Sequence, residues 1–65
     1  MRIKLTNKWS GEVGFVKCIH TKEKYFENTF DESEAKVFTK TTVTKALKQL
    51  NEYCSDNTYE SVTVA

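Results

Sequence analysis

The chain is 65 residues long, with 38% hydrophobic and 29% charged residues and a formal net charge of +1. A chain of this length buries roughly 60% of the surface that its unfolded form exposes, so we expect one marginally stable domain, residues 1–65. The near-zero net charge excludes a strongly acidic DNA mimic and a dedicated DNA-coating protein, because each needs a large excess of one sign of charge.

The beginning of the chain predicts a first strand. Ile3 and Leu5 alternate with charged or polar residues, which is typical of a strand with one solvated face. The charges around them stand where the apolar region of a signal peptide would run, so a cytoplasmic protein is expected. Residues 7–11 are polar and contain a glycine, which favours a turn.

Residues 12–20 are rich in β-branched and aromatic side chains and predict a second strand. Their apolar residues do not keep a period of two. A strand covered on both faces, or a bulge near Gly14, would explain this. Residues 21–24 indicate a hairpin turn, after which Tyr25 and Phe26 begin a short third strand.

The second half of the chain predicts a loop, a helix and a last strand. Residues 27–34 are acidic around Phe30 and indicate a loop, and residues 35–38 a brief extended segment. A helix is predicted from about Thr41 to Cys54, because the apolar residues there follow a 3.6-residue period. This apolar stripe consists of Val43, Ala46, Leu47, Leu50, Tyr53 and Cys54.

Both ends of this helix carry sequence signals. Thr39, Thr41 or Thr42 can cap its start by accepting a hydrogen bond from a free backbone N–H group. Turn-forming residues at 55–58 follow its end, and the alternation of Val62 and Val64 with polar residues then predicts a final strand.

These elements define an α+β fold in the order β-β-β-α-β. A meander of a few short strands has too little to bury its apolar face against. We therefore expect a small antiparallel sheet of three or four strands with the helix packed on one face.

The C-terminal half, from "DESEAKVF" onward, resembles small uncharacterised proteins of phages and prophages of Gram-positive bacteria. The resemblance implies a phage accessory protein in the cytoplasm of a bacterial host, and it transfers no catalytic residues. The matching residues are Ala35, Lys36, Val37 and Phe38, then Ala46, Leu47 and Leu50 in the helix, then Val62 and Val64.

The two cysteines and the single histidine are the candidates for metal or nucleophile chemistry. Cys18 and His20 share one face of the second strand, and Cys54 could approach from the end of the helix. The spacing lacks the paired C-x-x-C pattern of a structural zinc site, and nothing in it secures a thiol–imidazole contact. Free thiols are expected in the cytoplasm, and no metal, cofactor or enzymatic activity is predicted.

Charged residues suggest two alternative binding surfaces. The acidic residues around Phe30 could dock a basic partner protein. Basic residues on the solvated face of the sheet, with Trp9 at its edge, could instead grip phosphates and stack bases. The acidic group comprises Glu27, Asp31, Glu32 and Glu34, and the basic groups comprise Arg2, Lys4 and Lys17 on the strands and Lys36, Lys40, Lys45 and Lys48 near the helix.

Four of the large aromatic residues outside the helix stripe are together more than this small core is expected to bury. Trp9 is interpreted first as a lid on one end of the core and otherwise as an exposed anchor for a partner. Surplus aromatic residues could also line a homodimer interface. These residues are Trp9, Tyr25, Phe26 and Phe30.

The function predicted from the sequence is therefore binding without catalysis. The favoured partner is a host or defence protein, the alternative is nucleic acid bound by Arg2, Lys4 and Lys17, and a homodimer is a further option. The predicted partner-binding residues are Trp9, Tyr25, Phe30, Asp31, Glu32 and Glu34.

Overall fold

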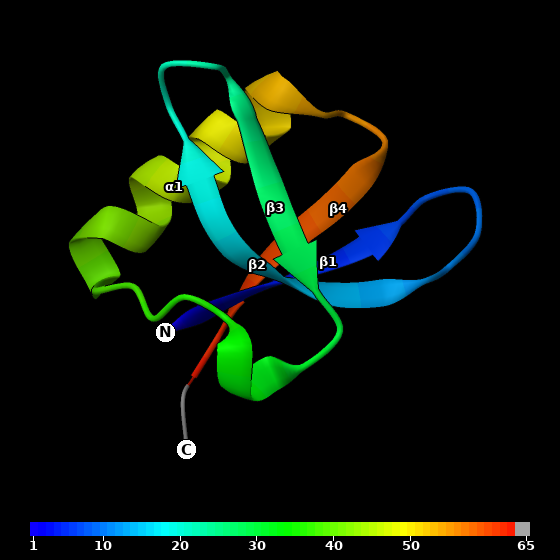
Figure 1. Ribbon diagram of the computed structural model, residues 1–65, viewed down its shortest axis with the longest axis horizontal. Helices are drawn as coiled ribbons and strands as arrows, with labels where there is room; N and C mark the ends of the chain where they lie inside the picture. Colours follow the sequence, from blue (N-terminus) through cyan, green and yellow to red (C-terminus); the bar gives the residue numbers. More distant parts are fainter. Residues whose placement is uncertain (64–65) are drawn as a thin grey trace.

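A computed structural model of the chain describes residues 1–63. Within these residues it contains a four-stranded sheet, one α-helix and one short 3-10 helix, in the predicted order β-β-β-α-β (Figure 1). No helix in this part of the chain is long and apolar enough to cross a membrane. The elements are β1 (Arg2–Asn7), β2 (Val13–His20), β3 (Tyr25–Thr29), the 3-10 helix η1 (Glu32–Glu34), α1 (Lys40–Tyr53) and β4 (Asn57–Val62).

The strands lie in the order β3-β2-β1-β4, and every neighbouring pair is antiparallel. The chain reaches β4 from β3 through α1, which crosses from one edge of the sheet to the other (Figure 1). The predicted α+β class and the helix on one face of the sheet are confirmed.

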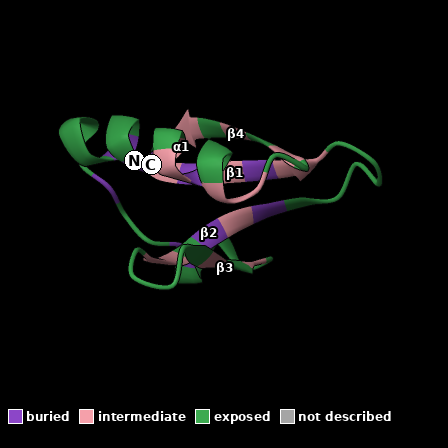
Figure 2. Ribbon diagram, turned by 90° about the horizontal axis from the view of Figure 1, so that it is seen from above, coloured by how far each residue is buried: buried purple, intermediate pink, exposed green. Residues whose placement is uncertain are grey.

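The sheet is bent because β1 and β2 pair over a short distance. Their register runs only from Lys4–Phe15 to Thr6–Val13, after which β2 leaves β1 and stays paired with β3. The β2–β3 pair therefore diverges from the β1–β4 pair (Figure 2). Beyond the divergence the carbonyl of Val16 accepts a hydrogen bond from the backbone N–H of Lys36, so the segment before α1 takes the place of β1.

A β-bulge between Val16 and Cys18 switches the faces of β2. Val16 is fully buried on the inner face, and an uninterrupted strand would send Cys18 and His20 to that face as well. The extra residue, Lys17, instead turns Ile19 toward the core and the other two outward.

The prediction of a bulge near Gly14 was therefore wrong by three residues. Gly14 serves a close approach instead, because a Cβ atom there would lie 3.2 Å from the backbone oxygen of Thr29.

Helix α1 begins and ends one residue before its predicted bounds. Thr39 is its N-cap: the Thr39 side chain accepts from the backbone N–H of Thr42, while the Thr42 hydroxyl accepts from the backbone N–H of Thr39. This reciprocal capping satisfies donors at the helix start and explains why helix formation begins here. The buried core consists of Val43, Ala46 and Leu50 from α1 together with Ile3, Leu5, Val16 and Phe38.

Two predicted strands differ in length from those in the structure. β3 continues to Thr29, so Glu27 lies on a strand and not in the acidic loop. β4 begins at Asn57, where the sequence indicated a turn, and Val64 lies outside the described residues. Tyr59 of β4 closes the helix end, because its hydroxyl donates to the carbonyl of Cys54.

Candidate functional site

An open hollow lies on the inner face of the sheet, at the end that α1 does not cover. Its floor includes Leu5, Gly14 and Phe26, which are continuous with the edge of the core, and its volume is about 220 Å³. Val13 also lines the hollow, although its pairing with Thr6, one step from Leu5–Gly14, directs its side chain to the outer face. Phe30 lines the same hollow and is 72% exposed. Apolar side chains that remain in solvent beside a concave surface are typical of a binding site.

Polar groups also line this hollow. Asn7 donates a hydrogen bond to the side chain of Asn57 across the β1–β4 pair at 3.3 Å. Asn28 and Glu12 also line it. Polar groups make up the larger part of the exposed lining, so they can hydrogen-bond to a ligand that also contacts the apolar residues.

Trp9 is 84% exposed, so its interpretation as a lid on the core was wrong. It lies in the turn between β1 and β2, which projects at the end of the molecule opposite α1 (Figure 1). The side-chain oxygen of Asn7 accepts the backbone N–H groups of Trp9 and Ser10, each at 2.9 Å. The turn is therefore fixed by local hydrogen bonds while the indole ring stays in solvent.

The acidic residues after Phe30 form the ordered turn η1. Asp31 caps it by accepting the backbone N–H of Ser33 at 3.0 Å and the Ser33 hydroxyl at 2.6 Å. These hydrogen bonds, led by the hydroxyl, hold the pKa of Asp31 below its ordinary value. Glu34 accepts from the hydroxyl of Thr29 at 3.2 Å. The carboxylates of Asp31, Glu32 and Glu34 all remain exposed and form an acidic surface that follows Phe30.

Two of the three basic residues predicted for nucleic acid lie beside carboxylates. Arg2 pairs with Glu32 and Lys4 pairs with Glu60, each at 3.6 Å. Lys17 is exposed at the bulge. The ion pairs offset the positive charge that phosphate binding on this face would need.

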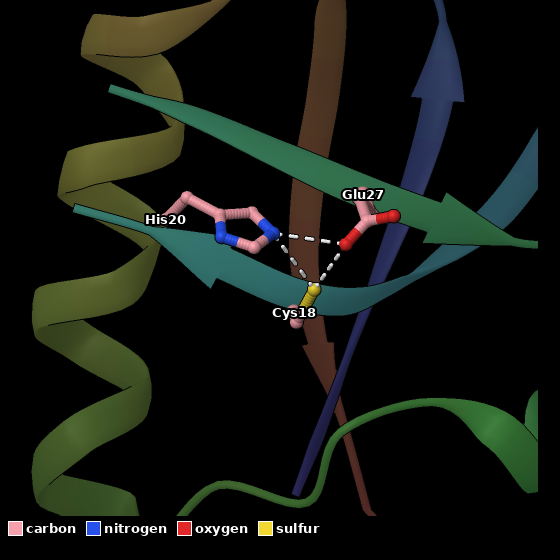
Figure 3. A group of neighbouring side chains, drawn as sticks. All are labelled: Cys18, His20 and Glu27. Atoms are coloured by element: carbon pink, nitrogen blue, oxygen red, sulfur yellow. Dashed lines mark hydrogen bonds and ion pairs between the residues drawn. The ribbon is translucent and has the colours of Figure 1, made fainter. Parts of the chain in front are cut away.

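Cys18, His20 and Glu27 meet on the outer face of the β2–β3 hairpin (Figure 3). The Cys18 thiol donates to the Glu27 carboxylate at 2.8 Å, and Nε2 of His20 lies 2.9 Å from the same oxygen. The Cys18 sulfur and Nε2 of His20 are 3.3 Å apart. Tyr25, opposite His20 in the register, stacks on the imidazole with ring centroids 4.4 Å apart.

The cluster resembles a thiol–imidazole–carboxylate arrangement, but its electrostatics oppose a nucleophile. The hydrogen bond to Glu27, followed by burial, raises the pKa of the Cys18 thiol. The hydrogen bonds from Cys18 and then from His20 lower the pKa of Glu27. A thiolate here would face a carboxylate, whereas reactive cysteines lie in positive surroundings.

Sequence reasoning missed Glu27 and grouped Cys54 with Cys18 and His20 instead. Cys54 belongs to a different cluster, beside Asn57 and Tyr59. The hairpin turn itself carried the missing signal. A turn at residues 21–24 places residue 20 opposite residue 25, and two further steps place Cys18 opposite Glu27.

The residues predicted to bind a partner are not all together. Phe30 and the acidic residues that follow it are contiguous, but Tyr25 lies at the other end of β3 beside His20. Another exposed apolar residue, Val37, is 59% exposed and lines a second hollow against α1. Both cysteines of the described chain are free.

Compared with models of protein families, with curated proteins and with solved structures, the chain finds no match.

Proposed function

We propose that the chain binds a partner protein through the hollow between Val13 and Phe30, without catalysis of its own. The observation that carries this proposal is the 72% exposure of Phe30 beside a hollow that combines apolar residues at its floor, Leu5 and Phe26, with polar residues around them. A marginally stable chain of 65 residues gains stability from each buried aromatic ring, so an aromatic ring left in solvent calls for another role. Interface hot spots are enriched in aromatic side chains that cluster around such pockets.

Charge around the hollow indicates the chemistry of the partner. Glu12 lines the hollow, and Asp31 and Glu34 follow Phe30 in the chain, whereas Glu32 is paired with Arg2. We expect the partner to insert an apolar side chain and to present Lys or Arg to these carboxylates, since complementary charge steers association and suppresses wrong partners. The resemblance of the C-terminal half to small phage proteins favours a host or defence protein as this partner.

Trp9 extends the proposed surface. It follows Asn7 of the hollow by two residues, in a turn whose hydrogen bonds limit the ordering cost of binding. Nucleic-acid binding by Arg2, Lys4 and Lys17 stays a prediction, and the ion pairs of Arg2 and Lys4 weigh against it.

Affinity capture with matched variants tests the proposal. The tagged wild-type chain, Phe30→Ser and Val37→Ser are incubated with lysate of a Gram-positive bacterium, and retained proteins are compared by mass spectrometry. Val37 is the matched control, because it is apolar and exposed but lines the other hollow. We expect one protein to be retained by the wild type and by Val37→Ser and to be lost from Phe30→Ser.

Other outcomes would contradict the proposal. Loss with Val37→Ser and retention by Phe30→Ser would place the interface on the second hollow. If retention of the protein disappears after nuclease treatment, nucleic acid is the favoured partner. If light scattering gives a dimer mass for the wild type and a monomer mass for Phe30→Ser, a homodimer is favoured.

A further inference from the structure

We propose that Cys18, His20 and Glu27 form a zinc site on the outer face of the β2–β3 hairpin. The three side chains offer a sulfur, an imidazole nitrogen and a carboxylate oxygen, which are the donor types that Zn²⁺ takes in proteins. One potential ligand atom of each lies within 4.8 Å of the others. This site is separate from the proposed partner surface, because it lies on the opposite face of the sheet.

The three ligand atoms lie slightly closer together than they would around a tetrahedral ion. Zinc–ligand bonds of about 2.0–2.3 Å at tetrahedral angles place neighbouring ligand atoms roughly 3.3–3.6 Å apart. The sulfur of Cys18 and Nε2 of His20 are already 3.3 Å apart, and Glu27 is 2.8 and 2.9 Å from them. Zinc binding therefore needs the exposed carboxylate of Glu27 to withdraw by less than an ångström, which a side-chain rotation provides.

The backbone holds the ligands in place from two strands. The bulge at Lys17 turns Cys18 and His20 to the outer face, and the hairpin register brings Glu27 opposite Cys18. The ring of Tyr25 packs on the imidazole of His20 with an interplanar angle of 16°. Support of this kind, from groups next to the ligands, keeps them oriented toward a metal.

Binding is balanced in charge and protons. Zn²⁺ takes the place of the thiol proton of Cys18, which passes to solvent, so that a thiolate and a carboxylate neutralise the ion while His20 binds through its neutral Nε2. The ligand residues are partly exposed, so a water molecule can reach the fourth position. A bound ion would join β3 to the part of β2 that has left β1, and so fasten the edge hairpin.

Cobalt substitution tests the site. The reduced full chain is titrated with Co²⁺, and a thiolate-to-cobalt charge-transfer band saturating at one ion per chain is expected, followed by its loss when Zn²⁺ displaces the cobalt. Cys18→Ser should abolish the band, whereas Cys54→Ser, which changes the other free thiol, should leave it intact. The affinity for Zn²⁺ is measured in competition with a chromophoric chelator. Glu27→Gln should lower this affinity by more than roughly 10–100-fold, which is the cost of losing a residue that only supports a metal ligand.

A second readout identifies the ligand set even if a variant folds poorly. The chain contains a single histidine, so its imidazole resonances in a nitrogen-15 NMR spectrum report on His20 alone. Zinc should shift the Nε2 resonance of the wild-type chain. Absence of the cobalt band, its persistence in Cys18→Ser, or an unshifted Nε2 resonance at saturating zinc would each overturn the proposal.

Discussion

The two ends of the inner face of the sheet differ in what covers them. At the end beneath α1, Ile3, Val16 and Leu50 are fully buried, whereas at the other end Phe30 stays 72% exposed beside a hollow. Helix α1 has 14 residues and lies at the end of the molecule opposite the turn between β1 and β2 (Figure 1). The other end of the inner face is left uncovered and is available to a partner. Stability and the proposed binding therefore depend on different ends of the same face of the sheet.

The strongest test of the covered end is Leu50→Ala. This change removes a fully buried side chain at the centre of the contact between α1 and the sheet, and we expect it to lower the free energy of unfolding by about 2–5 kcal/mol. Small domains are stable by only about 5–15 kcal/mol, so this loss removes a large fraction of the total stability. Urea unfolding followed by circular dichroism measures the loss. Lys48→Ala, on the exposed side of α1, is the control, and an equal loss in both variants would contradict the packing described here.

A smaller effect is expected at the start of the same helix. Thr39→Ala removes both the capping oxygen and its reciprocal contact with Thr42, which should cost about 1 kcal/mol of unfolding free energy. Thr41→Ala, in the exposed first turn, should cost less because Thr41 is not the cap. Thermal unfolding of the two variants side by side checks the order, and a reversed order would show that another threonine caps α1.

The smallest effect concerns pH at the open end. Ser33→Ala removes the hydroxyl that donates to Asp31, so the pKa of Asp31 should rise toward its ordinary value. In the wild type the pKa of Asp31 is lowered by folding. The contribution of Asp31 to stability is therefore complete above the pKa that this residue has in the unfolded chain. It is lost as the pH falls through the pKa that Asp31 has in the folded chain.

Carbon-detected NMR titration of the side-chain carboxyl groups measures this directly. The variant should lose less stability than the wild type as the pH falls through that acidic range. An unchanged pKa of Asp31 would mean that the hydroxyl contact is not formed in solution.

The covered end was predictable from the sequence, because its apolar residues recur at the spacing of a helix or of a strand. The stripe that includes Val43 and Leu50 requires a helix with one buried side, and the alternation of Ile3 and Leu5 requires a strand facing it. The threonines before the stripe also contained the observed cap, although the sequence left three choices open.

The candidate sites were less predictable, because they depend on single residues that break a period. One extra residue at Lys17 decides on which face Cys18 and His20 lie, and the broken pattern of residues 12–20 did not indicate which residue is extra. The exposure of Trp9 depends on how far a turn projects beyond the core, and an indole ring in a polar turn fits either outcome. Glu27 could have been placed from the hairpin register, had the third strand been extended by one residue beyond Phe26.

Urea unfolding of Phe30→Ser, measured beside Leu50→Ala, tests the contrast between the two ends most directly. We predict a free energy of unfolding within about 0.5 kcal/mol of the wild type, because a residue exposed in the folded state loses little when it is shortened. A loss of about 2 kcal/mol or more, comparable to that of Leu50→Ala, would place Phe30 in the core and contradict the open end of the sheet as a binding surface.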